Sequence, residues 1–321
     1  MIEAFPLIEM SGPPRERGRQ YGRQASARIA LGVEHYATQL AKMSCDWPTI
    51  RGLVQDCLPR IEAFEPAYVE EMRGIAEGAG LDFEAIVLLN ARTEILKLGS
   101  GAGGRLSARA PAPSDDACTG VVALPEATPS RRLIHAQNWD WKVECAETAV
   151  VLSIRRDDGP DLLTFTEAGG LARSGLNAAG IAIDFECAPD ETFQVHPERG
   201  LLVHANHWVS PVALATLKDT GIANTPCTLY RDLRVRSLLA PQIGSITREA
   251  VKTALFDDFA APWSVCRPPR AAVNGTMTAT VAMIVREPAL GVMEVAPLPA
   301  LDRHFTTYHL PAGRPATVAA G

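Results

Sequence analysis

One cysteine in this sequence stands where a nucleophile could be exposed. Cys118 follows a stretch of small and acidic residues, and the apolar run "TGVVAL" begins directly after it. If the peptide bond before Cys118 is cut, the thiol becomes a nucleophile beside its own α-amine. A free thiol has a pKa of about 8.5 and an α-amine about 8, so the amine can take the thiol proton near neutral pH without a histidine. This placement points to covalent acyl-transfer chemistry. The structural alternative is a small buried residue that begins a strand.

The elements that would position Cys118 change in kind along the chain. Before it, apolar residues recur close to the helical period over residues 14–44, and further helices are expected over 49–64, 66–81 and 82–96. Residues 99–117, "GSGAGGRLSARAPAPSDDA", are typical of a mobile loop that could move away and open a pocket. A plain interdomain linker would explain this stretch equally well.

After Cys118 the sequence is typical of β-structure. Short stretches rich in Val, Ile, Leu, Thr and Phe alternate with turn residues, then two helices precede a closing hairpin. The expected strands are 118–124, 132–139, 148–156, 161–168, 180–186 and 200–208, the helices 228–240 and 247–257, and the hairpin 278–297. This order predicts layered α+β packing rather than βαβ repeats. Residues 1–117 and 118–321 are expected to form one domain together.

Composition excludes several functional classes. The chain has 321 residues, 47% of them hydrophobic, and a net charge of −6 without a basic cluster, so a large core is expected and nucleic acid is not an expected partner. The first residues show no signal peptide, and no apolar run approaches the roughly 20 residues of a membrane span. The seven scattered cysteines form no C-x-x-C pair, which argues against a disulfide framework or a zinc site. We therefore expect a cytoplasmic protein that binds no metal and needs no cofactor.

Four stretches in order resemble peptidase family C45, the isopenicillin N acyltransferase-like group of N-terminal nucleophile hydrolases. They are "GPPRERGRQYGRQ" (12–24), "EEMRGIAEGAGLDFEAIVLLNARTEI" (70–95), "CTGVVALPEATPSRRLIHAQNWDW" (118–141) and "LLVHANHW" (201–208). The resemblance covers nearly the whole chain. It implies a four-layer αββα sandwich in which two sheets face each other between helical layers.

The resemblance also implies a precursor that cuts itself. Cleavage between Ala117 and Cys118 would leave residues 1–117 as an α chain and 118–321 as a β chain. The enzyme would then act on amides, peptides or acyl thioesters through an acyl-Cys118 thioester. Family members carry glycine before the cysteine, whereas this chain has Ala117, whose methyl group crowds the attack that cleavage requires.

Two further catalytic residues are assigned by the resemblance. Asp140 matches the family's aspartate and would hold the α-amine of Cys118 by a charge-assisted hydrogen bond; the alternative is a turn residue at a strand end. Asn206 matches the oxyanion-hole asparagine, whose amide can lower the barrier by roughly 3 kcal/mol. His204 and His207 flank Asn206, but strand alternation would turn them to opposite sides, which argues against a shared metal.

The remaining assignments concern the substrate pocket. Arg267 is expected to bind a substrate carboxylate, because an arginine fork suits that group. Asn177 either contacts substrate or stabilises a turn, and Trp139 lines the pocket or fills the core. Arg231 is expected to be a charge on a helix face.

The chain departs from the family pattern after Ile183. In relatives, a helix pair and a strand follow this point, whereas here the sequence runs almost directly to "LLVHANHW". The missing part would cover one face of a sheet, so one helical layer would be reduced. We expect a homodimer that buries this face, or a pocket open to a bulky acyl donor or peptide.

Four functions therefore compete. Hydrolysis of a linear amide is favoured slightly, and an acyl-CoA-dependent N-acyltransferase uses the same thioester. An inactive remnant would act as a binding or scaffold protein. A cysteine hydrolase that needs no processing would use His135 or His204 as its base.

Overall fold

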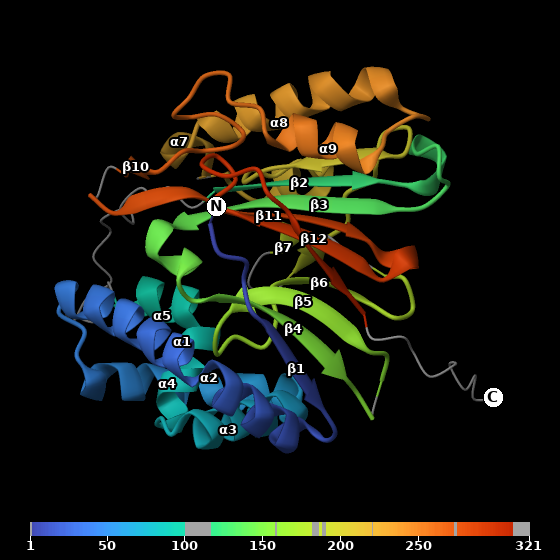
Figure 1. Ribbon diagram of the computed structural model, residues 1–321. Helices are drawn as coiled ribbons and strands as arrows, with labels where there is room; N and C mark the ends of the chain where they lie inside the picture. Colours follow the sequence, from blue (N-terminus) through green and yellow to red (C-terminus); the bar gives the residue numbers. More distant parts are fainter. Residues whose placement is uncertain are drawn as a thin grey trace. The chain divides into compact units, whose positions relative to one another are not determined.

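The computed structural model describes residues 2–99, 117–157, 159–181, 186–187, 191–219, 221–272 and 275–310 (Figure 1). Its chain contacts form two compact units. The Cys118 unit comprises Met1–Ala4, Ala112–Ala146 and Leu176–His309, and the helix-rich unit comprises Phe5–Pro111, Glu147–Gly175 and Leu310–Gly321. The expected loop at 99–117 lies almost wholly outside the described residues.

The helix-rich unit packs helices on a small sheet. Its helices are α1 (Pro14–Lys42), α2 (Trp47–Phe64), α3 (Pro66–Ala79), α4 (Phe83–Asn90) and α5 (Arg92–Gly99). Its sheet has the order β1-β4-β5-β6, formed by β1 (Leu7–Ser11), β4 (Ala149–Arg155), β5 (Leu162–Glu167) and β6 (Ser174–Asn177). β1 runs parallel to β4, and β4 runs antiparallel to β5. Ile8, Val150 and Leu152 join the apolar stripes of the helices in one buried cluster.

The helix expected over 82–96 is interrupted at Ala91. The side chain of Asn90 donates to the carbonyls of Ile86 and Gly169, both at 2.9 Å, and its oxygen accepts from the N–H of Leu171 at 3.0 Å. An asparagine that bonds to backbone groups competes with helix continuation. The chain therefore divides into α4 and α5 where it is tied to the turn after β5.

Helices α1 and α3 touch through their backbones. Each carries two glycines one turn apart at the crossing. A Cβ added at any of them would lie 2.1–2.3 Å from a backbone oxygen of the other helix: Gly18, Gly22, Gly74 and Gly78. The buried ion pair of Arg17 and Glu71, at 2.8 Å, flanks this crossing. No side chain larger than hydrogen fits between these helices.

The Cys118 unit packs helices on a larger sheet. Its strands are β2 (Ala117–Ala123), β3 (Ile134–Lys142), β9 (Leu201–His204), β10 (Arg270–Ala271), β11 (Met277–Glu287), β12 (Val292–Pro297) and β13 (Thr306–His309). They are ordered β13-β12-β11-β3-β2-β9, with β10 paired to β11, and a separate hairpin joins β7 (Glu186–Cys187) to β8 (Thr192–Phe193).

Helices α8 (Cys227–Leu239) and α9 (Arg248–Leu255) cover one face of this sheet (Figure 1). Val235 and Val251 pack there against Val121, Ala136 and Met283 of the strands. The shorter helices of the unit are α6 (Pro211–Thr216) and α7 (Gly221–Asn224), and 3-10 turns occur at Pro125–Ala127, Val143–Ala146, Ala240–Gln242 and Pro288–Leu290.

The α+β class is confirmed, and most expected elements are present with shifted ends. Thr247 caps α9 by accepting from the N–H of Ala250 at 3.1 Å. Three differences stand out. β1 was not expected, the strand expected over 200–208 ends at His204, and most of the strand expected over 180–186 lies outside the described residues. Strands β4 and β5 belong to the same unit as the N-terminal helices. Where the structure describes the chain, its helices are too short or too polar to cross a membrane.

The close contact of α1 and α3 predicts that two glycine substitutions change the free energy of unfolding in opposite directions. Gly74→Ala should lower the free energy of unfolding by about 1–3 kcal/mol, because the new methyl group must push two backbones apart. Gly52→Ala in α2 is the matched control: nothing lies within 4 Å of its added Cβ, so the better helix propensity of alanine should raise stability by about 0.5–1 kcal/mol. Chemical denaturation measures both changes. Equal effects would contradict the close crossing.

Candidate active site

The strand register brings Cys118 beside the predicted catalytic segment of β3. Cys118 lies opposite Trp139 and Ala117 opposite Asp140, while Thr280 of β11 lies opposite Asp140 on its other side. Directly opposed residues in a sheet point to the same face. Thr119 lies opposite Asn138. These two residues and Asp140 point to the face covered by α8 and α9, because Val121 and Ala136, two residues away on the same strands, pack against those helices. Cys118 and Trp139 point to the other face.

Asp140 is the centre of a buried polar network. Its Oδ1 accepts from the hydroxyl of Thr280 at 2.7 Å, and its Oδ2 lies 3.5 Å from Nε of Arg267. The Thr280 hydroxyl in turn accepts from the backbone N–H of Arg267 at 2.8 Å. A register shift between Thr280 and Ala282 of β11, of the kind that a β-bulge produces, lies next to this network. Burial raises the pKa of Asp140, and the charges of Arg267 and Arg231 oppose that rise.

Asn206 replaces a missing strand partner of Cys118. β9 pairs with β2 only from Gly120, which faces His204, and then leaves the sheet. The same register would place Asn206 opposite Cys118. Oδ1 of Asn206 accepts from the backbone N–H of Cys118 at 2.7 Å. A side chain thus satisfies the nitrogen that would become the α-amine after cleavage.

Arg231 is the residue that sequence reasoning placed wrongly. It was expected on a helix face, but it is fully buried. Its Nη1 donates to the carbonyl of Cys118 and, at 2.7 Å, to the hydroxyl of Thr119, and its Nη2 donates to Oδ1 of Asn206 at 2.9 Å. A signal was present in the sequence, since Arg231 lies at helical spacing from the apolar Val235 and Leu239.

The Cys118 thiol is held in its protonated form in the uncleaved chain. Burial and the charge of Asp140 raise its pKa to about 11. Hydrogen bonds from the Asp140 backbone and the Gln137 side chain, and the charge of Arg231, oppose part of this rise. The thiol therefore needs a base to become a nucleophile near neutral pH.

The other predicted site residues fall in three different settings. Arg267 is buried, and beside Asp140 its Nη2 contacts Sγ of Cys227 at 2.9 Å. Asn177 ends β6, where its oxygen accepts from the N–H groups of Ala179 and Ile181, the bonds of a side-chain-stabilised turn. Trp139 is buried opposite Cys118. The substrate roles of these three residues stay predictions.

The histidines give two results. His204 and His207 do not face opposite sides: their rings stack with centroids 6.3 Å apart, because the strand ends at His204. Nε2 of His204 lies 2.7 Å from the buried carboxylate of Glu186. His135 lies opposite Val122. At about 3.3 Å per residue that is roughly 13 Å along the strand from Cys118, too far to take its proton.

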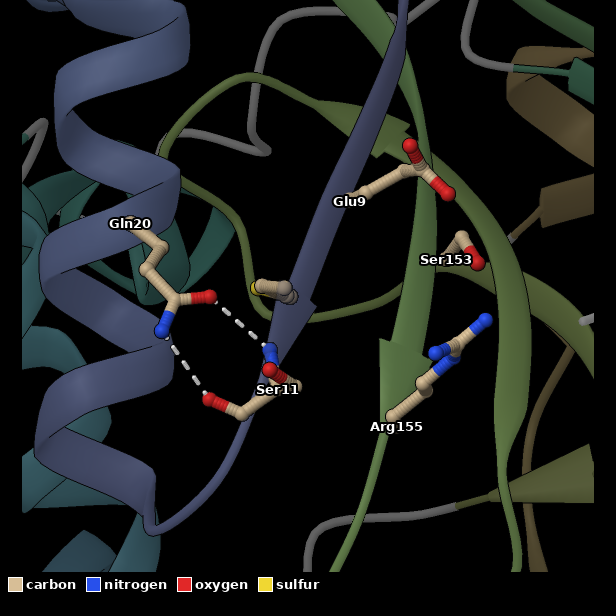
Figure 2. A pocket seen from close by; sticks show the side chains of 6 residues that line it. Glu9, Ser11, Gln20, Ser153 and Arg155 are labelled. Atoms are coloured by element: carbon tan, nitrogen blue, oxygen red, sulfur yellow. Dashed lines mark hydrogen bonds between the residues drawn. The ribbon is translucent and has the colours of Figure 1, made fainter. Parts of the chain in front are cut away.

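Two other features do not add to this site. Among the residues placed by the structure, no group of three or more His, Cys, Asp or Glu side chains could hold a metal ion. A polar pocket of about 240 Å³ lies in the helix-rich unit (Figure 2). Its lining residues are Glu9, Met10, Ser11, Gln20, Ser153 and Arg155. Figure 2 shows Gln20 spanning the backbone of Ser11 by two hydrogen bonds. None of the predicted site residues lines it.

The comparison with known proteins bears on the Cys118 site. This chain is related to a fungal acyltransferase. It is 32% identical over 180 residues, or 56% of its length, to the acyl-coenzyme A:6-aminopenicillanic-acid-acyltransferase 40 kDa form of Emericella nidulans. The aligned part is 46% of that protein, so the chain matches about half the length of this relative. No family model matches the chain. The similarity confirms the resemblance stated from the motifs.

The raised thiol pKa predicts how Cys118 reacts. In the uncleaved chain, its alkylation by iodoacetamide should rise about tenfold per pH unit through pH 9, because the thiolate fraction does. Asp140→Asn should speed the reaction at each pH, since it removes a carboxylate that raises the pKa. Peptide mapping by mass spectrometry separates internal Cys118 from an N-terminal one, and exposed Cys187 is the reference. A rate that levels off below pH 9 would contradict the raised pKa.

Proposed function

We propose that the chain is an enzyme that cuts itself before Cys118 and then transfers acyl groups through an acyl-Cys118 thioester. The observation that carries this proposal is the set of hydrogen bonds that fixes the backbone of Cys118. Its nitrogen bonds to Oδ1 of Asn206 and its carbonyl to Arg231, beside a buried aspartate. The relation to an acyltransferase supports the same chemistry.

Self-cleavage would begin with attack of the Cys118 thiol on the carbonyl carbon of Ala117. The C–N bond breaks, the nitrogen takes a proton and becomes the α-amine, and a thioester forms. Water then hydrolyses the thioester, which leaves a carboxylate on Ala117 and a free thiol on Cys118. Both residues lie on one continuous strand, where the backbone of Ala117 pairs with Asp140.

In the cleaved enzyme the α-amine would act as the base. It takes the thiol proton as sulfur attacks the acyl carbon, and it returns that proton to the leaving group. The amide N–H of Asn206 would stabilise the negative oxygen. Asp140 lies opposite Ala117 in the register, next to the new N-terminus, and would favour the charged amine that forms during each step.

Two acceptors remain for the acyl group. Water gives hydrolysis of a linear amide, which the sequence favoured slightly. An amine gives N-acyl transfer from an acyl-CoA thioester, and the printed name of the relative favours this second activity. The two differ in whether an acceptor excludes water from the acyl-enzyme. Of the two histidines considered as bases for an unprocessed enzyme, His135 is too far from Cys118, whereas His204, opposite Gly120, stays an alternative. The arranged hydrogen bonds argue against an inactive scaffold.

The finer architecture belongs to the same proposal. Each unit taken by itself is a sheet with a helical layer, which is half of an αββα sandwich. We propose that the two halves form the four-layer fold of the N-terminal nucleophile hydrolases. Cleavage before Cys118 would make the protein an α/β heterodimer, and the shortened segment after Ile183 would lead to a homodimer.

Intact mass measures self-cleavage directly. The wild-type protein should give two fragments, residues 1–117 and 118–321. Cys187→Ala should do the same, because Cys187 is an exposed cysteine outside the site. Cys118→Ala should stay whole, because the nucleophile is absent. An uncleaved wild type would contradict self-processing.

Acyl transfer is tested on the purified protein with a palmitoyl-CoA or phenylacetyl-CoA donor and with the matching p-nitroanilides. An acyl mass increase on Cys118, absent in Cys118→Ala, is expected. Products followed with and without an added amine separate transfer from hydrolysis. Turnover that persists in Cys118→Ala would overturn the thioester mechanism.

A further inference from the structure

We propose that Arg231 is the positioning residue of this site: it fixes the orientation of the Asn206 side-chain amide, so that Oδ1 stays on the Cys118 nitrogen and Nδ2 is offered to the substrate. This inference rests on the proposed function for its catalytic consequence. Its structural part stands on the contacts of one buried arginine that the acyl-transfer steps do not otherwise use.

The identity of the donors decides the orientation of Asn206. A guanidinium carries only donors, and so does the backbone N–H of Cys118. Both contact the same atom of Asn206, at 2.9 and 2.7 Å. That atom must therefore be the oxygen, since the amide nitrogen would face two donors. Rotation of the amide by half a turn would break both hydrogen bonds at once.

The sheet itself does not hold Asn206. β9 ends at His204, so Asn206 lies on a segment without ladder hydrogen bonds to β2. Helix α8 supplies the hold instead. The hydroxyl of Thr228 accepts from the backbone N–H of Asn206 at 2.7 Å, and Arg231, one turn further along, donates to its side chain. One residue of α8 therefore fixes the backbone of Asn206 and the other its amide.

The positive charge of Arg231 also acts on the Asn206 amide. Within the described ranges none of its hydrogen-bond partners is a carboxylate: they are the carbonyl of Cys118, the hydroxyl of Thr119 and the amide of Asn206. A charged donor on Oδ1 polarises the amide and makes its N–H a stronger donor. This helps most when negative charge develops on the substrate oxygen.

The first test is kinetic and uses the cleaved enzyme. Arg231→Met should lower kcat about 100-fold, as loss of an oxyanion donor does, while KM changes less than about threefold. Arg231→Lys should recover part of the loss, because ammonium can still donate to Oδ1. Arg234→Met is the matched control, since Arg234 lies on α8 but pairs with Asp257 at 2.7 Å, and it should leave kcat unchanged.

A double-mutant cycle asks whether Arg231 acts through Asn206. In an Asn206→Ala background, Arg231→Met should change kcat by less than about threefold, because the amide it orients is gone. Losses that multiply would overturn the positioning role, as would a normal kcat in Arg231→Met. Thermal unfolding of each variant shows whether it folds, and Arg231→Lys keeps the test open if Arg231→Met does not.

A second measurement needs no substrate. In the ¹⁵N spectrum, the Asn206 side-chain amide, assigned by its loss in Asn206→Ala, should give one sharp pair of protons in the wild type. In Arg231→Met it should broaden or split into two orientations. An unchanged pair would overturn the positioning of Asn206. A changed pair in a protein that turns over no acyl donor would instead overturn the proposed function and leave the positioning intact.

Discussion

Side chains form the backbone hydrogen bonds of Cys118 that a neighbouring strand would otherwise form. The site depends on this constraint. Where β9 leaves the sheet, the N–H and carbonyl of Cys118 would become an open edge. Asn206 takes the first and Arg231 the second. Strand edges normally have to be paired or covered. Here the cover consists of the two side chains that we assign to the proposed reaction, so the same bonds that close the sheet would also orient that chemistry.

Three buried charged side chains lie close to this strand edge. Asp140 is buried next to Arg267, which also contacts Cys227, and Arg231 lies on the same face without a carboxylate among its described hydrogen-bond partners. Burial of the Cys118 thiol and the carboxylate of Asp140 raise the pKa of the thiol, whereas the charge of Arg231 opposes part of this rise. The net rise keeps the thiol protonated near neutral pH, and in the proposed function cleavage creates a base at its own nitrogen. Cleavage would therefore act as the switch that turns a resting thiol into a nucleophile.

Much of this organisation could be predicted from residues taken alone. The apolar spacing in α1, the capping threonine of α9 and the closing hairpin all follow from local pattern. The motif around Cys118 points to the nucleophile that we propose. The break at Asn90 could not be predicted, because it depends on a turn far away in the sequence. The helical spacing of Arg231, Val235 and Leu239 in the sequence indicated that Arg231 lies on the buried face of its helix. A charge at such a position is usually assigned to a surface, since only the folded structure shows the carbonyl and amide that compensate it.

The glycine crossing changes what the resemblance to the acyltransferases means. Two of the four stretches that carry it, residues 12–24 and 70–95, contain the two halves of a single contact between α1 and α3. Their glycines are required by the distance between two backbones, whatever reaction the protein performs. A descendant that had lost Cys118 would still need them in order to fold. Likeness in these stretches is thus a marker of shared architecture, and inherited chemistry has to be judged from the few residues around the end of β2.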